Sequence, residues 1–484
     1  METKMLEFTP NRPTPEALAR RLPEGFVMGT ATAAAQIEGA VKVGNRTRSV
    51  WDAFSAEPGR IVDGSDTSVT ADHFHRYRED VALMRELGSD AYRFSFAWTR
   101  LQPHGTGPLD RDGADFYDRL LDELGEAGIS SFATISHWDL PEEYARGWLD
   151  RDTAHRLGEF AGLLGERFGD RIDAWITINE PATVTLNGYA LGLHAPGYSL
   201  LFDALPAVHH QLLGHGLAVE ALRGAGVSGR IGMTNTHSPV EPVADTVDDH
   251  MMSALFDVVH NRMFADPVLL GHYPEVPAEL GALFSVFDSV PSSDLDQIHQ
   301  PLDFYGLNYY QPSRVAAGAG TGESPDGTSE AMTGLPFRLE EFEGVPTTAF
   351  GWPIVPAGFA RSLAEVQERY GDSLPPVYIT ENGASFDDVM TADGSVPDPE
   401  RVAFLSDHLE AALDAVAPGG AADGLDLRGY FVWSLMDNWE WAAGFTQRFG
   451  LVHVDFATGT RTPKTSFHWL RSVLAARGDS RLSA

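Results

Sequence analysis

Two glutamates stand at the ends of apolar segments that lie far apart in the chain. Glu180 ends the run AWITINE (174–180), and Glu381 lies near the end of VYITENG (377–383). Each run resembles a short buried strand that stops at a carboxyl beside an asparagine. Two carboxyls that face each other can cleave a glycosidic bond, because one donates a proton to the leaving oxygen while the other attacks the sugar carbon or activates water.

Other polar and aromatic side chains stand within or just beyond further apolar runs. They are Gln36, which we expect to end the first strand, and Arg93, His137, Trp138, Asn179, Asn308, Tyr310, Trp433, Glu440 and Trp441. Amide, imidazole and carboxyl groups supply the donors and acceptors that a hydroxyl-rich ligand requires. Indole rings can pack against the apolar C–H faces of sugar rings.

The apolar runs that must position these residues alternate with amphipathic segments. Strands are expected near 26–36, 91–97, 131–137, 174–180, 230–236, 303–310, 377–383 and 429–436. Between them, Leu157, Phe160, Ala161, Leu164 and Phe168 repeat at helical spacing, as do Val402, Leu405, Leu409 and Ala412. Gly88 and Gly128 have the type and position of glycines that end helices. The alternation predicts a closed (β/α)8 barrel, in which the strand ends converge on one face.

The organisation predicted is a single (β/α)8 TIM barrel domain over residues 1–484, with its core at about 20–470 and with long βα loops. The best candidate for a linker is the Gly/Ser/Thr-rich stretch 316–334 (AAGAGTGESPDGTSEAMTG). Because a seventh strand still follows it, we interpret this stretch as a long loop after the sixth strand.

Composition excludes several classes of function. The 35 basic and 69 acidic residues give a net charge of −34, which disfavours nucleic acid and anionic membrane surfaces as partners. The chain has no cysteine, so disulfides and thiolate chemistry are excluded. We find no apolar leader in METKMLEFTPNRPTPEAL and no apolar run of 18 residues, and therefore expect a soluble, cytoplasmic protein that acts on small molecules.

Eight segments together resemble glycoside hydrolase family 1 β-glucosidases over about residues 20–470. They are FVMGTATAAAQIEGA (26–40), AYRFSFAWTR (91–100), SHWDLP (136–141), TINEP (177–181), GYALGLHAPG (188–197), GLNYY (306–310), YITENG (378–383) and WSLMDNWEWAAGFTQRFGLVHVD (433–455). One such segment alone is weak, whereas eight in the same order are specific.

The resemblance implies a role for each matching residue. Glu180 is similar to the acid/base of the family and Glu381 to its nucleophile, while Arg93 and Tyr310 resemble the pair that keeps the nucleophile ionised and oriented. The matching glycone-binding positions are Gln36, His137, Asn179, Glu440 and Trp441, with Trp138 and Trp433 as aromatic walls and Phe449 on the same rim. Asn308, in the matching GLNYY segment, is expected among the catalytic residues, and Trp352 resembles a platform for the aglycone. The resemblance also implies a cis peptide between Trp433 and Ser434.

Two contrasts within the family narrow the expected substrate. Members that cleave 6-phosphoglycosides typically carry serine where this chain has Glu440, together with a lysine further on, and we interpret Glu440 as an anion that repels phosphate. Plant thioglucosidases carry glutamine at the position of Glu180, so an O-glycoside is favoured here. We expect burial and the neighbouring anion to raise the pKa of Glu180 so that it can act as an acid.

Each residue also has an ordinary structural explanation when taken alone. Glu180 could cap a helix, His137 could be a satisfied core histidine, and Arg93 needs an acidic partner wherever it is buried. The pairs His73/His75 and His209/His210 lack metal-ligand spacing, so we expect neither a metal nor another cofactor.

The reaction expected is hydrolysis of terminal β-D-glucosyl residues, with galactosyl and fucosyl residues also possible. A transglycosylase of the same family and a non-catalytic sugar-binding barrel remain alternatives. The natural aglycone, the preferred sugar and the oligomeric state, with a homo-oligomer possible, stay open.

Overall fold

A computed structural model describes residues 12–144, 146–320 and 331–477, and these contain a closed barrel of eight parallel strands. The strands are β1 (Val27–Ala31), β2 (Ala91–Ser95), β3 (Ser130–Ser136), β4 (Ala174–Asn179), β5 (Arg230–Thr236), β7 (Phe304–Asn308), β10 (Val377–Asn382) and β11 (Leu427–Trp433). Their order around the barrel is β1-β11-β10-β7-β5-β4-β3-β2. The predicted (β/α)8 barrel is therefore confirmed.

The barrel strands are buried on both sides, which explains their nearly continuous apolar sequences. All eight predicted strands are present, with ends that differ by a few residues. The prediction for the first strand was wrong at its end, because β1 stops at Ala31 and Gln36 lies on the short helix α2 (Ala34–Ile37). The alanine-rich sequence before Gln36 favours a helix as much as a strand.

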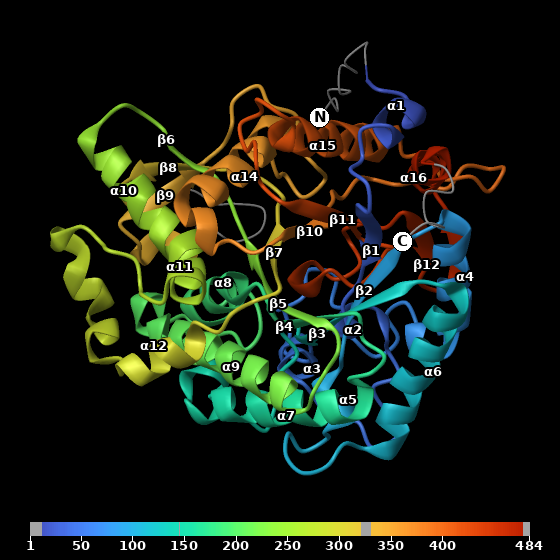
Figure 1. Cartoon of the computed structure of the whole chain (residues 1–484), viewed down its shortest axis with the longest axis horizontal. Coiled ribbons are helices and arrows are strands. Elements are labelled where there is room, and N and C mark those ends of the chain that lie inside the picture. Colours follow the sequence, from blue (N-terminus) through green and yellow to red (C-terminus); the bar gives the residue numbers. More distant parts are fainter. Residues whose placement is uncertain (1–11, 145, 321–330, 478–484) are drawn as a thin grey trace.

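Helices surround the strands and separate them from solvent, as Figure 1 shows. One helix follows each strand in the outer layer: α4 (His73–Leu87), α6 (Arg111–Ala127), α7 (Asp152–Phe168), α9 (Leu205–Gly224), α11 (Met263–Leu270), α14 (Pro356–Tyr370), α15 (Pro399–Val416) and α16 (Thr465–Ala476). The predicted apolar face of α7 is buried. Gly88 and Gly128 end α4 and α6 in the left-handed conformation, as their positions predicted.

Shorter elements lie in the connections between strands and helices. The helices are α1 (Pro15–Ala19), α3 (Val50–Ser55), α5 (Trp98–Leu101), α8 (Pro181–Thr183), α10 (Val247–Asp257) and α12 (Ser292–Ile298), and a π-helix spans Val184–Ala190. Two small sheets are formed by β6 (Val240–Pro242), β8 (Ser313–Ala317) and β9 (Phe337–Glu340), and by β12 (Val452–Asp455) with β13 (Thr460–Pro463).

The stretch 316–334 does follow the sixth barrel strand, β7, as expected. Its described part is not all irregular, since β8 extends to Ala317 and pairs antiparallel with β9. Residues 321–330 of this stretch lie outside the described residues, and so do residues 1–11, on which part of the expectation of no leader rested.

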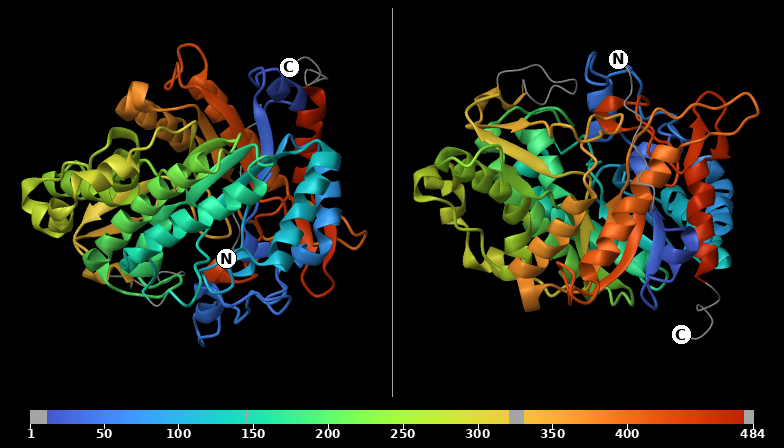
Figure 2. Two further views of the ribbon diagram at one scale, coloured as in Figure 1. Left: turned by 60° about the horizontal axis from the view of Figure 1, so that its bottom comes forward. Right: turned by 90° about the horizontal axis from the view of Figure 1, so that it is seen from above.

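Segments from the two ends of the chain pack together. Leu18 and Ala19 of α1 form a small apolar cluster with Val473 of α16. Helices α4, α6 and α16 lie on one side of the barrel in all three views of Figures 1 and 2. Within the described residues, the helices are too short or too polar for any of them to cross a membrane.

Backbone geometry is unusual where the strands end. Glu180, Trp138 and Trp441 have positive φ angles of 47°, 74° and 49°. Side chains other than glycine rarely occupy this region, and such strained residues gather at functional sites. The peptide between Trp433 and Ser434 is cis, as the resemblance implied, and so is the one between Ala195 and Pro196.

Candidate active site

Glu180 is held at the point where β4 turns into α8. Its backbone N–H donates to the carbonyl of Thr234 on β5 at 2.9 Å, which fixes the turn. Its buried carboxyl accepts two hydrogen bonds, from Asn308 Nδ2 to Oε1 at 2.7 Å and from Thr183 Oγ1 to Oε2 at 2.8 Å. The carboxyl is therefore oriented by groups from two different elements.

Glu381 is buried near the end of β10 and has a different set of partners. Its Oε1 accepts from the guanidinium of Arg93, and its Oε2 accepts from the hydroxyl of Tyr310 at 2.6 Å. Arg93 is fully buried on β2, and its ion pair with Glu381 balances the buried positive charge. This glutamate thus has an ion-pair partner within hydrogen-bond distance, whereas the donors to Glu180 are neutral groups.

A chain of hydrogen bonds joins the two glutamates. Arg93 also donates to Asn179 Oδ1 at 2.6 Å, and Asn308 Nδ2 donates to the same oxygen at 3.2 Å. Thr380 Oγ1 donates to Asn308 Oδ1 at 2.7 Å. In the barrel β4 and β10 are separated only by β5 and β7, and these bonds connect their ends.

The electrostatic setting of Glu180 suits proton transfer. Burial, together with the negative charge on Glu381, raises the pKa of Glu180 to about 7, against the opposing effect of its two hydrogen-bond donors. The expected upward shift is confirmed. A carboxyl with this pKa holds its proton for a large fraction of the time near neutral pH and can both donate and accept one.

A third carboxyl, Glu440, lies beyond the end of β11. Gln36 Nε2 donates to Glu440 Oε2 at 3.2 Å, and also to Asn438 Oδ1 and to the carbonyl of Trp439, both at 3.0 Å. Burial and the charge of Glu381 raise the pKa of Glu440 to about 8. Glu440 therefore holds a proton more readily than an ordinary glutamate, and its interpretation as an anion that repels phosphate stays a prediction.

His137 lies between aromatic rings on the same side of the site. Its ring is nearly parallel to Trp433 and Trp441, with ring-centroid distances of 6.0 and 6.1 Å. Burial lowers its pKa well below the ordinary value, and the charge of Arg93 adds to this effect, so the ring is neutral. Trp138 packs on Trp441 at 4.5 Å and donates its indole N–H to the carbonyl of Asn179.

Among the buried polar atoms of the site that have no hydrogen-bond partner in the described structure, two belong to side chains predicted to bind the glycone. They are Gln36 Oε1 and His137 Nδ1. Leaving such atoms unpaired is costly unless a ligand or water satisfies them. Their presence beside the indole rings of Trp433 and Trp441 is consistent with a ligand that carries hydroxyl groups.

A second aromatic group lies on the side of Tyr310. Trp352 stacks on Phe350 with a centroid distance of 4.6 Å and an interplanar angle of 11°, and it contacts Tyr310 and Phe449. Phe449 also contacts Tyr310. Trp352 and Phe449 thus both contact Tyr310, which binds Glu381, while their roles as aglycone platform and glycone rim stay predictions.

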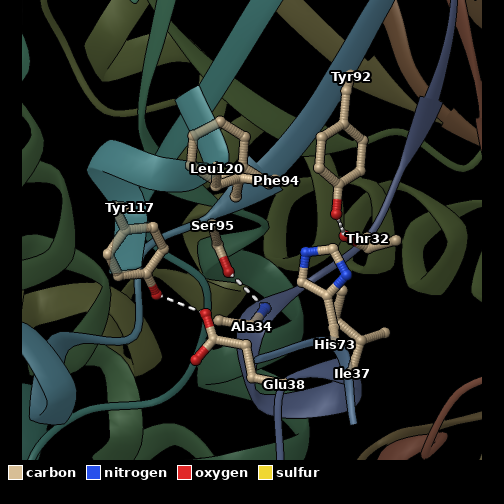
Figure 3. Close-up of a pocket in the computed structure, with 10 residues that line it drawn as sticks. All are labelled: Thr32, Ala34, Ile37, Glu38, His73, Tyr92, Phe94, Ser95, Tyr117 and Leu120. Atoms are coloured by element: carbon tan, nitrogen blue, oxygen red, sulfur yellow. Dashed lines mark hydrogen bonds between the residues drawn. The ribbon is translucent and has the colours of Figure 1, made fainter. Parts of the chain in front are cut away.

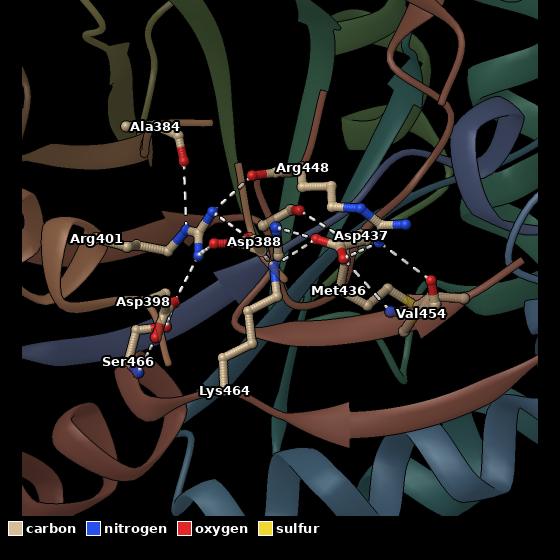
Figure 4. Close-up of polar contacts among 12 residues, drawn as sticks. Ala384, Asp388, Asp398, Arg401, Met436, Asp437, Arg448, Val454, Lys464 and Ser466 are labelled. Atoms are coloured by element: carbon tan, nitrogen blue, oxygen red, sulfur yellow. Dashed lines mark hydrogen bonds and ion pairs between the residues drawn. The ribbon is translucent and has the colours of Figure 1, made fainter. Parts of the chain in front are cut away.

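The loops that carry Glu440 and Phe449 are held by a buried network of charges, shown in Figure 4. Lys464 Nζ binds Asp388 Oδ2 at 2.5 Å and Asp437 Oδ1 at 2.6 Å. Arg448 binds Asp437, and Arg401 donates to Asp388 and to the carbonyl of Arg448. These bonds connect three segments that are distant in sequence, at residues 388–401, 437–448 and 464.

A small cavity of about 10 Å³ is lined in part by Ala34 and Ile37 of α2, the helix that carries Gln36, and Figure 3 shows its lining. Its size is that of one water molecule. His73, on its wall, binds Asp80 through Nδ1 at 2.7 Å, and His75 binds Asp72. Among the described residues, no group of three His, Asp or Glu side chains is placed to hold a metal ion.

A larger groove of about 240 Å³ lies elsewhere, between the loop at Gly44 and the start of α6. Its walls include Arg46, Asp110 and Arg119. None of the predicted site residues lines it.

Sequence reasoning did not identify several residues that shape the site. Thr183 donates to Glu180, and Thr380 donates to Asn308. Asn438 accepts a hydrogen bond from Gln36. Thr183 could have been found, because it lies three residues after Glu180 at the start of a helix, a spacing at which side chains meet. Thr380 and Asn438 have no such local signal.

Two buried carboxyls at the ends of barrel strands, surrounded by indole rings and amides, define a site of the glycoside hydrolase class. The chain belongs to glycosyl hydrolase family 1, whose family model matches residues 18–479.

Named relatives cover almost the whole chain. A protein of Thermotoga maritima called β-glucosidase A is 39% identical over 95% of this chain and 99% of its own length. A protein of Bifidobacterium breve called a bifunctional β-D-glucosidase/β-D-fucosidase is also 39% identical, over 94% of this chain and 98% of its own. Among solved structures, an enzyme from Alicyclobacillus herbarius is 43% identical and has a TM-score of 0.86, with 97% of this chain and 99% of that chain covered.

Proposed function

We propose that the protein is a retaining β-glucosidase that hydrolyses terminal β-D-glucosyl residues through a covalent glycosyl-enzyme. The observation that carries the proposal is the unequal environment of the two glutamates. Glu381 is paired with Arg93 and Tyr310, while Glu180 has a pKa raised to about 7. A nucleophile must be ionised and a general acid must hold a proton, and these two environments favour that division.

In the first step Glu180 gives its proton to the glycosidic oxygen, and a carboxylate oxygen of Glu381 forms a bond to the anomeric carbon as the alcohol leaves. Once Glu381 is esterified its negative charge is gone, so the pKa of Glu180 falls. In the second step Glu180 takes a proton from water, which attacks the ester and releases the sugar with its β configuration.

The glycone is proposed to bind Gln36, His137, Asn179, Glu440 and Trp441, between the walls formed by Trp138 and Trp433. The unpaired atoms Gln36 Oε1 and His137 Nδ1 support this placement, because both are available to sugar hydroxyls. Trp352, backed by Phe350, is proposed as the aglycone platform.

The test is an assay with a panel of nitrophenyl β-glycosides, combined with NMR of the sugar first released. We expect the β-glucoside to be cleaved and β-glucose to appear first. A crystal structure should place the two carboxyls about 5–5.5 Å apart, rather than the roughly 6.5–9.5 Å of inverting enzymes. Appearance of α-glucose first, or the wider separation, would contradict the mechanism. A chain that binds glucosides without cleaving any would be the sugar-binding barrel.

Two further properties are proposed with this function. β-Fucosides are included as substrates, since a relative bears the name of a bifunctional glucosidase/fucosidase. The aromatic surface of Phe350, Trp352 and Phe449 can also bind a sugar or alcohol acceptor, so transglycosylation stays a second activity of the same site. Product analysis with added cellobiose or alcohol distinguishes transfer from hydrolysis.

We also propose that residues 1–484 form one catalytic domain and that the protein acts in the cytoplasm. Cell fractionation and limited proteolysis test these two points, and the mass in solution decides whether it forms a homo-oligomer.

A further inference from the structure

The hydrogen bonds around Glu180 distinguish its two oxygens. The starting point is Arg93, whose guanidinium can only donate, and which donates to Asn179 Oδ1 at 2.6 Å. This bond fixes the orientation of the Asn179 amide, because its oxygen and not its NH2 group must face the guanidinium.

The same reasoning extends to the next amide. Asn308 faces the now fixed oxygen of Asn179 and must present its NH2 group to it, at 3.2 Å. Thr380 Oγ1, which donates to Asn308 Oδ1 at 2.7 Å, supports this orientation from the other side. The NH2 group of Asn308 then also donates to Glu180 Oε1 at 2.7 Å.

An oxygen that faces an NH2 group serves as an acceptor and is a poor place for a proton, since two donors would then oppose each other. Oε1 of Glu180 therefore stays unprotonated and accepts the hydrogen bond from Asn308. The remaining oxygen, Oε2, has the hydroxyl of Thr183 as its neighbour at 2.8 Å. A hydroxyl can donate to an ionised oxygen and can turn away or accept when that oxygen is protonated.

We infer that Oε2 of Glu180 is the atom that carries the transferred proton, and that Thr183 is a positioning residue that holds this oxygen and favours its ionised form. This inference rests on the proposed role of Glu180 as acid and base. In the first step the Oε2 proton passes to the glycosidic oxygen, which keeps the electron pair of the broken bond. In the second step Oε2 accepts a proton from the attacking water, and the Thr183 hydroxyl stabilises the carboxylate between the two steps.

The other groups that face Glu180 come from several elements. Glu381 on β10 and Glu440 after β11 are acidic, Arg93 on β2 is basic, and Tyr310 after β7 is neutral. The Thr183 hydroxyl lowers the pKa of Glu180, against burial and the charge of Glu381. Its removal must therefore raise that pKa further.

The experiment compares Thr183→Val, which loses the hydroxyl with little change of shape, with Thr183→Ser, which keeps it. The matched control is Thr185→Val, two residues further along, where the hydroxyl binds Gln211 at 2.7 Å and not the carboxyl. Because Glu180 must be protonated for the first step, kcat/KM falls as pH rises through its pKa. In Thr183→Val we expect this alkaline limb to move up by about one pH unit.

Thr183→Ser should restore the wild-type limb, and Thr185→Val should leave the limb in place. A purely structural role of Thr183 would lower kcat/KM equally at every pH and leave the limb unmoved, which would overturn the inference, as would an equal shift in Thr185→Val. If Thr183→Val fails to fold, Thr183→Ala removes the same hydroxyl in a smaller side chain.

A second measurement keeps this test separate from the proposed function. The carboxyl of Glu180 is titrated by ¹³C NMR in protein labelled at glutamate, with the signal assigned from its loss in Glu180→Gln. An upward shift in Thr183→Val supports the inference even if the wild-type protein cleaves no glucoside, in which case only the proposed function fails. If the wild-type enzyme is active but the pKa of Glu180 is unchanged in Thr183→Val, the inference is overturned and the proposed function stands.

Discussion

The guanidinium of Arg93 binds the side-chain oxygen of Asn179 at 2.6 Å while it pairs with Glu381. One residue of β2 thereby positions groups on β4 and β10. The bond also fixes which side of the Asn179 amide faces His137, since Nδ2 then donates to His137 Nε2 at 3.1 Å. His137 must therefore carry its proton on Nδ1, the buried atom that has no partner within the described residues.

The coupling between the two glutamates gives a first prediction. Replacing Glu381 by glutamine removes a like charge, so the pKa of Glu180 should fall from about 7 by roughly one to two pH units, while burial keeps it above the ordinary value. ¹³C NMR titration of the Glu180 carboxyl measures this, and Glu343→Gln, at an exposed position, is the control. Unchanged titration would mean that the two carboxyls do not interact.

A second prediction concerns Glu440. Its carboxyl binds Gln36 at 3.2 Å and is proposed to bind hydroxyls of the glycone. A hydrogen bond to a charged carboxylate contributes about 1.5–3 kcal/mol. Glu440→Ser should therefore lower kcat/KM for a β-glucoside by roughly 10- to 200-fold. Thermal unfolding should change little, and exposed Glu343→Ser serves as the control. Wild-type kinetics in Glu440→Ser would remove this residue from the site.

The charge network behind the site gives a third prediction. Lys464 is completely buried and binds both Asp388 and Asp437, so Lys464→Met leaves two carboxylates with reduced compensation. Loss of one partner of a buried ion pair destabilises by about 3–5 kcal/mol. The melting temperature should drop, and KM should rise because Asp437 lies in the segment that leads to Glu440.

Lys42→Met is the matched control, since Lys42 is exposed. An equal melting temperature for the two variants would show that the network contributes no stability.

The barrel could be predicted from the sequence because its strands are apolar runs that end in turns and alternate with helical periodicity. Gln36 was misplaced because a run of alanines fits a short helix as well as a strand. The network of Lys464 could not be predicted, since its members lie in loops and helix ends without periodic spacing. For Glu440, the residue type was visible, whereas its raised pKa depends on burial beside Glu381, which only the folded chain shows.

The last prediction distinguishes the two glutamates by the stereochemistry of azide rescue. Glu381→Ala should abolish turnover, because no ester can form, and it leaves space on the side of the sugar from which Glu381 attacks. Added azide can enter there while Glu180 still protonates the leaving oxygen, so a β-glycosyl fluoride or nitrophenyl donor should give the α-azide, with inversion.

Glu180→Ala should respond in the opposite way. Donors with good leaving groups still form the ester on Glu381, but without a general base water attacks it about 10²–10⁴-fold more slowly. Azide needs no base and should release the sugar as the β-azide, with retention. The motivating observation is that Arg93 and Tyr310 bind Glu381, whereas Glu180 has only neutral donors and a raised pKa. Exchanged stereochemistry would exchange the two roles, and the same azide from both variants would exclude the two-step mechanism.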